Sequence, residues 1–356
     1  MDSIITDATG NLLEAEADAL VNTVNTVGVM GKGIALQFKT AFPDMFADYK
    51  RAADNGEVAL GRMNIYATGR MTPRFIINFP TKGHWRSKSR LADIRRGLDD
   101  LVSQVESLGL SSIAIPPLGC GNGGLEWAEV RPVIVEAFEA LPDLEVLLYA
   151  PSGSPTAAEM VNRTQRPTMT RGRAALVAML TLYAPRVVDV SIIEVQKLMY
   201  FLQEAGEPLQ LNYAKDRYGP YADNLRHVLN DVEGHLLIGY GDASAKVHSA
   251  EPIRVLAGAL DEAERLLADA PELTDRISHV LDLVTGFESP YALELLSTVH
   301  WVAVCEAPDA ADDPPMLAKL VGEWSTRKER MFVSDHVVEA WEQLRSQGWL
   351  RELSPA

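Results

Sequence analysis

The sequence holds few cysteines, the residues from which disulfide frameworks and thiolate metal sites are built. Its 356 residues include two cysteines, Cys120 and Cys305, which lie far apart and match no metal-ligand spacing. Low cysteine content without a pairing grid is typical of proteins in reducing compartments. We therefore expect a cytoplasmic protein that uses neither a metal nor a cofactor.

Long apolar runs are absent as well. No window reaches the roughly 18 apolar residues that a membrane span requires, and the N-terminal MDSIITDATG lacks the basic start and apolar stretch of a signal peptide. We expect no membrane association. The 47% of apolar and 7% of aromatic residues describe an ordinary globular core, and the length suffices for two or three domains.

Positive charge is scarce, since the chain carries 33 basic and 49 acidic side chains and a formal net charge of −16. This balance argues against a non-specific nucleic-acid binder, because phosphate contacts require Lys and Arg. Most of the excess, −11, falls after residue 155, whereas residues 70–96 reverse the sign with eight basic residues against Asp93 alone. One basic strip therefore interrupts an acidic protein.

The apolar pattern predicts an α/β domain at residues 1–155, a linker at 156–170 and a mainly helical domain at 171–356. In the first domain, strand-like runs alternate with helical spacing, which favours a mixed central sheet with helices on both faces. These runs are residues 19–24, 63–68, 74–79, 112–117 and 144–150. The linker belongs to the Pro-, Ser-, Thr- and Gly-rich stretch PSGSPTAAEMVNRTQRPTMTRG.

Two glycine-rich loops follow strand-like runs. The first, within VNTVNTVGVMGKGIALQFK (residues 21–39), has the wrong glycine spacing for a nucleotide-binding P-loop and no hydroxyl residue after its lysine. The second is PLGCGNGG (residues 117–124). Each loop alone is compatible with a tight strand-to-helix turn. Together they predict backbone amides that bracket one crevice for an anionic ligand such as a diphosphate.

These segments resemble a known family. Gly10-Asn11-Leu12, residues 19–25, the first glycine loop and residues 117–121 are similar to the ADP-ribose-binding motifs of macrodomains, over most of residues 1–150. Within that group, VNTVNTVGVMGKGIALQFK and NFPTKGHW resemble the DarG family, whose members are DNA ADP-ribosyl glycohydrolases and antitoxins of DNA-modifying DarT toxins. The resemblance implies removal of ADP-ribose from thymidine in single-stranded DNA.

The resemblance also implies a set of ADP-ribose-binding residues: Asn11, Leu12, Asn22, Asn25, Gly31, Lys32, Gly33, Leu118, Gly119, Cys120, Gly121, Asn122 and Gly123. Asn25 would face the distal ribose. Asn11 stands where many macrodomains carry an aspartate that binds adenine, and an Asx turn is the other interpretation. Asn22 is equally compatible with a structural amide. Cys120 is expected to be a packed residue rather than a nucleophile.

Lys82 is the catalytic residue that the resemblance implies. It would approach the anomeric carbon of the distal ribose, either attacking it or stabilising charge as the base departs. Arg86, Lys88 and Arg90 are expected to lower its pKa. Related enzymes carry an aspartate at the position of Gly123, so a carboxylate partner is not evident here.

The basic strip next to Lys82 predicts a contact with DNA. A cationic track with exposed aromatic rings suits a single strand, through phosphate contacts and base stacking. A solvated surface is the other interpretation. The candidate DNA-contacting residues are His84, Trp85, Arg86, Lys88 and Arg90.

In the second domain, the segments from Lys197 to Gln203 and from Tyr218 to Arg226 resemble the Panacea (SocA-like) antitoxin domains. The resemblance implies a module that binds a DarT-type DNA ADP-ribosyltransferase toxin. Two other functions stay open at this point. In the first, the protein is a reader that binds ADP-ribose without cleaving it. In the second, it is a purely stoichiometric toxin inhibitor.

Overall fold

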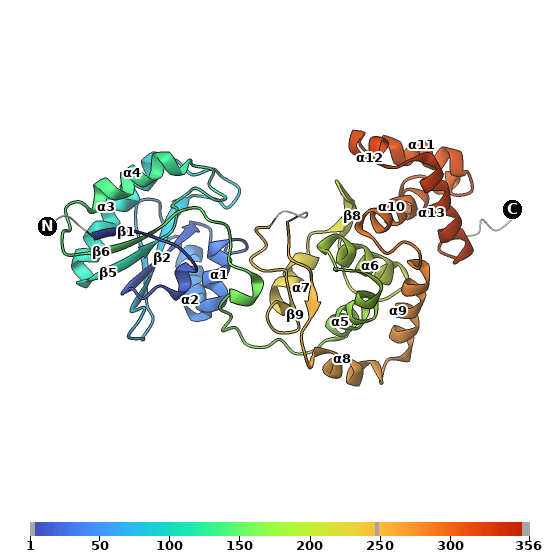
Figure 1. Ribbon diagram of the computed structural model, residues 1–356, viewed down its shortest axis with the longest axis horizontal. Coiled ribbons are helices and arrows are strands. Elements are labelled where there is room, and N and C mark those ends of the chain that lie inside the picture. Colours follow the sequence, from blue (N-terminus) through green and yellow to red (C-terminus); the bar gives the residue numbers. More distant parts are fainter. Residues whose placement is uncertain (1–3, 246–248, 351–356) are drawn as a thin grey trace. The chain divides into compact units, whose positions relative to one another are not determined.

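The computed structural model describes residues 4–245 and 249–350 and divides the chain into two compact units (Figure 1). The first unit consists of the residues up to Gln165 together with Gly241–Ala245, and the second consists of the rest. The boundary at Gln165 lies inside the segment 156–170. None of the helices formed by the described residues is long and apolar enough to cross a membrane.

A six-stranded mixed sheet forms the centre of the first unit. In spatial order the strands are β1 (Ile4–Ala8), β6 (Glu145–Tyr149), β5 (Ser112–Ile115), β2 (Ala19–Asn25), β4 (Phe75–Lys82) and β3 (Asn64–Ala67). Neighbours are parallel, except that β3 runs antiparallel to β4. The five predicted strands are confirmed. The short, partly polar strand β1 was not predicted.

Helices cover both faces of this sheet, as expected (Figure 1). They are α1 (Ile34–Ala41), α2 (Pro43–Asp54), α3 (Leu91–Leu108) and α4 (Trp127–Phe138), with short 3-10 turns at Leu12–Glu14 and Ala157–Glu159. Apolar residues of α3 and α4 pack with Val21 and Ile77, whereas those of α1 and α2 pack with Leu20 and Ile76. Adjacent residues of a strand point to opposite faces, so β2 and β4 are buried on both sides.

One segment of the first unit comes from much later in the chain. Asp242 lies 205 positions after Gln37, yet its carboxylate accepts a hydrogen bond of 2.6 Å from the Gln37 amide and one of 2.7 Å from the Ser154 hydroxyl. The backbone carbonyl of Asp242 accepts the Gly33 N–H at 2.9 Å. Asp242 is almost fully buried. This residue therefore holds the start of α1 and the end of the first glycine loop.

The second unit is mainly helical, as predicted. Its helices are α5 (Arg171–Tyr183), α6 (Ile192–Glu204), α7 (Leu225–Val232), α8 (Ala259–Leu267), α9 (Pro271–Leu283), α10 (Pro290–Trp301), α11 (Pro314–Glu323), α12 (Thr326–Met331) and α13 (Ser334–Ser346). Single turns occupy Ala184–Arg186 and Pro308–Ala310, and a π-helical turn occupies Val302–Glu306. Two small antiparallel pairs complete it: β7 (Tyr213–Asp216) with β8 (Gly219–Ala222), and β9 (Leu237–Ile238) with β10 (Arg254–Val255).

The two Panacea-like segments of the sequence meet in this unit. The amine of the fully buried Lys197, in α6, donates to the Pro220 carbonyl of β8 at 2.6 Å. The Gln196 side chain bonds both the N–H and the carbonyl of Ala222. Burial lowers the pKa of Lys197 to about 7. The residues that resemble the Panacea domains are therefore ones that hold the β7–β8 hairpin against α6.

Close packing between α3 and β4 yields a stability prediction at Gly97. A Cβ added to Gly97 would lie 2.3 Å from Cζ of the Phe79 ring. We expect Gly97→Ala to destabilise the first unit by about 1 to 3 kcal/mol, as other insertions into packed cores do. At an open helical site the same change stabilises by roughly 1 kcal/mol. Urea unfolding of the full chain measures the difference.

Asp99→Ala, at an exposed position of the same helix, is the matched control and should change stability little. A Gly97→Ala variant at least as stable as the natural protein would contradict the close contact between α3 and Phe79.

Candidate functional site

A β-bulge places Lys82 at the end of β4. Along the β2–β4 ladder Val24 pairs with Pro80, but Asn25 pairs with Lys82, so Thr81 is an extra residue. Proline lacks an N–H and is tolerated inside a sheet at such irregularities. The Thr81 hydroxyl donates to the Val24 carbonyl at 3.3 Å and fastens the bulge. The shift makes Lys82, instead of Thr81, the partner of Asn25 at the carboxyl end of the sheet.

The Lys82 amine reaches the second glycine loop. Its Nζ donates to the Asn122 carbonyl oxygen at 3.2 Å. Burial lowers the pKa of Lys82, and the positive charge of Lys88 lowers it further. Lys88 was among the three cations expected to act in this way, but the larger cause is burial, which the sequence does not reveal. A lowered pKa increases the fraction of free amine, the form that can act as a nucleophile.

The second loop offers unpaired amides. Within residues 4–245 and 249–350, the N–H groups of Gly121, Asn122 and Gly123 donate to no protein acceptor. The loop is closed by bonds from the Leu125 N–H to the Gly119 carbonyl and from the Ser89 N–H to the Gly123 carbonyl, at 3.1 and 3.0 Å. Three consecutive free donors on a fixed loop form a cradle that suits a diphosphate.

The two glycine loops approach each other. Gly33, with φ +62°, is the last residue of the first glycine loop and directly precedes α1. The positive end of that helix therefore lies at the first glycine loop. A Cβ at Gly33 would lie 3.6 Å from the Asn122 side-chain nitrogen. Because the Asn122 carbonyl also accepts from Lys82, the first loop, the second loop and the lysine converge. Gly31 and the exposed Lys32 lie on the same first loop.

The structure explains why no carboxylate stands at residue 123. A Cβ on Gly123 would lie 2.3 Å from the Gly119 carbonyl oxygen and 2.3 Å from the Ser89 hydroxyl. No side chain fits there while the loop keeps this shape. Ser89 is buried, and its hydroxyl has no partner among the described residues. Its place under the loop was missed, because nothing in the sequence sets it apart from other serines.

Asn11 and Leu12 lie at the start of the first 3-10 turn. The Asn11 Oδ1 accepts the Leu13 N–H at 3.0 Å, and its amide donates to the Glu159 carbonyl. The bond from the Leu13 N–H is that of an Asx turn, the other interpretation given for Asn11. Leu12 is buried beside it. A contact with adenine stays a prediction for both residues.

Asn22 lies fully inside the sheet. Its amide donates to Asn78 at 2.9 Å, and Asn78 donates to Asn64 at 2.9 Å, which makes a polar ladder across three strands. The Asn22 side chain has no exposed surface. The structure therefore favours the structural amide over a ligand contact.

Leu118 of the second loop belongs to the core beneath it, and Cys120 is partly buried against that core. Leu118 is fully buried. The Cys120 thiol lies 3.6 Å from the Leu118 carbonyl, and burial, with Glu126 nearby, raises the pKa of Cys120 to about 11. A thiol with so high a pKa is a poor nucleophile at neutral pH, in agreement with the expected packing role.

The basic strip carries a stacked aromatic pair directly after Lys82. The rings of His84 and Trp85 are 5.4 Å apart, and the Arg86 guanidinium lies 4.4 Å from the centre of the Trp85 ring. Trp85 is 45% exposed. Lys88 and Arg90 lie on the same connection to α3. This surface combines rings and cations in the way that single-strand binding requires.

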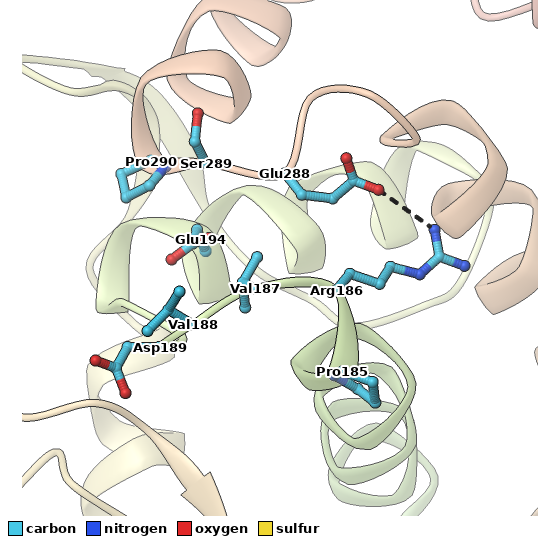
Figure 2. A pocket seen from close by; sticks show the side chains of 9 residues that line it. All are labelled: Pro185, Arg186, Val187, Val188, Asp189, Glu194, Glu288, Ser289 and Pro290. Atoms are coloured by element: carbon cyan, nitrogen blue, oxygen red, sulfur yellow. Dashed lines mark ion pairs between the residues drawn. The ribbon is translucent and has the colours of Figure 1, made fainter.

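Other parts of the chain offer weaker sites. The described residues contain no cluster of three or more potential metal ligands. Figure 2 shows a shallow hollow in the second unit, where Arg186 pairs with Glu288 at 3.7 Å. Glu194 in this hollow is bonded to Ser191 and Tyr183. Arg186, Glu288 and Glu194 are thus already paired within the protein, and we assign the hollow no ligand.

The electrostatic link between Lys82 and Lys88 is testable without an activity assay. We expect the pKa of Lys82, measured by NMR of the labelled amine, to lie below the ordinary lysine value. Lys88→Met should raise it, because a nearby positive charge is removed, while Lys88→Arg should leave it nearly unchanged. At a fixed pH, Lys88→Met then lowers the fraction of free Lys82 amine. An unchanged pKa in Lys88→Met would show that burial acts alone.

Comparison with known proteins gives consistent relatives. The Macro domain family model matches residues 21–134. A DNA ADP-ribosyl glycohydrolase of Thermus aquaticus is 47% identical over 343 residues, covering 96% of this chain and 93% of the relative. A DNA ADP-ribosyl transferase–DNA ADP-ribosyl glycohydrolase fusion protein of Thermosipho africanus is 33% identical over 158 residues, covering 40% of each chain.

Among solved structures, the macrodomain of Mycobacterium tuberculosis DarG is 53% identical and covers 42% of this chain and 99% of that one, with a TM-score of 0.42. The fold of the first unit is that of a macrodomain. Because the Thermus relative is similar over nearly the whole length of both proteins, the chain belongs to the DarG family of DNA ADP-ribosyl glycohydrolases.

Proposed function

We propose that the first unit hydrolyses the N-glycosidic bond that joins ADP-ribose to thymidine in single-stranded DNA. The observation that carries the proposal is the convergence of Lys82 with two glycine loops at one end of the sheet. The free amides of the second loop would hold the diphosphate, and α1 would contribute its positive end. In this arrangement the distal ribose would lie beside the lysine.

The reaction breaks the bond between the anomeric carbon and the base nitrogen. A bond forms from that carbon to the oxygen of water, and the water proton ends on the base nitrogen. The Lys82 amine contributes in one of two ways. It attacks the anomeric carbon to give a lysine adduct that water then hydrolyses, or its charged form stabilises the departing base. Gly123 offers no carboxylate to either route.

The strip after Lys82 would hold the DNA strand. Bases would stack on Trp85 and His84, and Arg86, Lys88 and Arg90 would contact phosphates. The distance of 4.4 Å between Arg86 and the Trp85 ring supports this role, since the guanidinium keeps an exposed ring in a fixed orientation. Because the strip begins directly after Lys82, the modified base would lie close to the reacting carbon. Both cysteines are free thiols, which fits a cytoplasmic site of action.

The second unit would bind a DarT-type transferase directly. A toxin that modifies single-stranded DNA needs a cationic groove, and the residues after 155 carry a net charge of −11. The Thermosipho relative is described as a fusion of a DNA ADP-ribosyl transferase with a DNA ADP-ribosyl glycohydrolase. A helical, acidic surface that occupies the groove would block modification before it occurs, while the macrodomain reverses it afterwards.

Lys82 separates an enzyme from a reader of ADP-ribose. We expect Lys82→Ala to abolish release of ADP-ribose from a modified thymidine oligonucleotide. Binding of free ADP-ribose should stay within about tenfold, or roughly 1.4 kcal/mol, because loop amides supply most contacts. Gel assays measure cleavage and calorimetry measures binding.

Two further variants sharpen this experiment. Lys39→Ala, on α1, is the control and should cleave normally. Lys82→Arg keeps the charge but is a poor nucleophile, so retained cleavage supports charge stabilisation and lost cleavage supports attack. If the natural protein binds ADP-ribose but releases none, it is a reader.

Direct toxin binding predicts protection without hydrolysis. The full chain carrying Lys82→Ala should still lower DNA modification by a DarT-type transferase in the presence of NAD⁺, up to a one-to-one ratio. A complex should elute in size-exclusion chromatography at low salt and weaken as salt rises. An unrelated protein of similar negative charge is the control. Undiminished modification at several-fold excess, with no complex, would leave hydrolysis as the sole protective activity.

A further inference from the structure

The turn that follows β2 is held rigidly. The Asn25 side chain donates to the Val29 carbonyl at 2.6 Å and accepts the N–H groups of Val27 and Val29 at 3.1 and 3.3 Å. The Tyr49 hydroxyl of α2 donates to the Asn25 carbonyl. Gly28 has φ +75°, and a Cβ there would lie 2.9 Å from the Lys50 side chain. The Asn25 amide, expected to face the ribose, is thus already engaged in shaping this turn.

This rigid turn presents apolar side chains to solvent. Val27 is 40% exposed and Val29 is 39% exposed, whereas Gly28 between them is buried against α2. Single exposed apolar residues are common on protein surfaces. Because hydrogen bonds fix the backbone of this turn, the two valines present an apolar surface that requires little backbone ordering on binding, which is the property of a preorganised contact.

The turn is joined directly to the backbone of the lysine. The Thr26 N–H donates to the Lys82 carbonyl at 3.2 Å, and the Thr26 hydroxyl donates to the Gly83 carbonyl at 2.6 Å. Val27 follows Thr26 by one residue, and His84 and Trp85 follow Gly83 directly. The apolar turn and the aromatic pair therefore leave the sheet side by side, from the strand ends that carry Asn25 and Lys82.

We propose that Val27 and Val29 contact the pyrimidine base that carries ADP-ribose and favour thymine through its C5-methyl group. The inference rests on the proposed hydrolysis of the thymidine linkage. The base is bonded to the anomeric carbon on which Lys82 acts, so it must lie beside the lysine. Apolar side chains distinguish thymine from other pyrimidines by contact with this methyl group. The valine side chains also form no hydrogen bond or ion pair with the base, so they do not hold it back when it departs.

Isosteric substitutions test the role of the valines. The full chain is compared with Val27→Thr, Val29→Thr and the double variant on two oligonucleotides, in which ADP-ribose is linked to the same nitrogen of thymine or of uracil. We expect the natural protein to prefer thymine in kcat/KM. The double variant should lose about tenfold on thymine, the order of effect seen for single methyl contacts, and less than threefold on uracil. Its affinity for free ADP-ribose should stay within twofold.

The control is Val188→Thr, the same substitution at an exposed valine of the second unit, 99% accessible. It should change neither rate, and thermal unfolding should be the same for all variants. The inference is overturned if the natural protein does not distinguish the two bases, or if the valine variants lose activity equally on both. Failure of the natural protein to cleave either substrate would instead refute the proposed hydrolysis.

Discussion

The extra residue in β4 is the constraint on which the site depends. Without Thr81 the β2–β4 ladder would continue in register, and Lys82 would follow Pro80 directly. Its side chain would then point to the face of the sheet opposite to that of Pro80, as strand alternation requires. The bulge breaks that alternation where three features need to meet: the lysine, the turn after β2 and the second glycine loop. Bulges are common next to active sites because they redirect a side chain without disturbing the rest of the sheet.

The second unit contains a network of buried charges within its apolar core. Glu294 is 2% exposed and accepts from Arg327 and from the fully buried Lys328, which also bonds Thr298 at 3.0 Å. Removing one partner of such a group leaves an uncompensated charge in the core, and this is strongly destabilising. The network joins α10 to α12 and fixes their relative positions.

Local patterns predicted the sheet and both glycine loops, since apolar runs and glycine spacing are visible in the sequence. Pro80 inside an apolar strand was also a visible sign of the bulge, because proline is confined to irregular positions in central strands. The burial that lowers the pKa of Lys82 was not predictable, as it depends on segments brought together by folding. The sequence also could not show that Ser89, from a separate loop, leaves no room for a side chain at residue 123. Nor could it show that the Asn25 amide is occupied by a hydrogen bond within its own turn.

The position of Asp242 has a consequence for how the chain is made. A ribosome releases the sheet, both glycine loops and Lys82 long before it releases residue 242. Until then the buried Gln37 amide and the Gly33 N–H lack the acceptors that they have in the finished protein, and an unpaired buried donor costs about 1 to 3 kcal/mol. A nascent or prematurely terminated chain would therefore hold the start of α1 loosely. The first glycine loop therefore reaches its final hydrogen bonding only after α5, α6 and α7 of the second unit have also been synthesised.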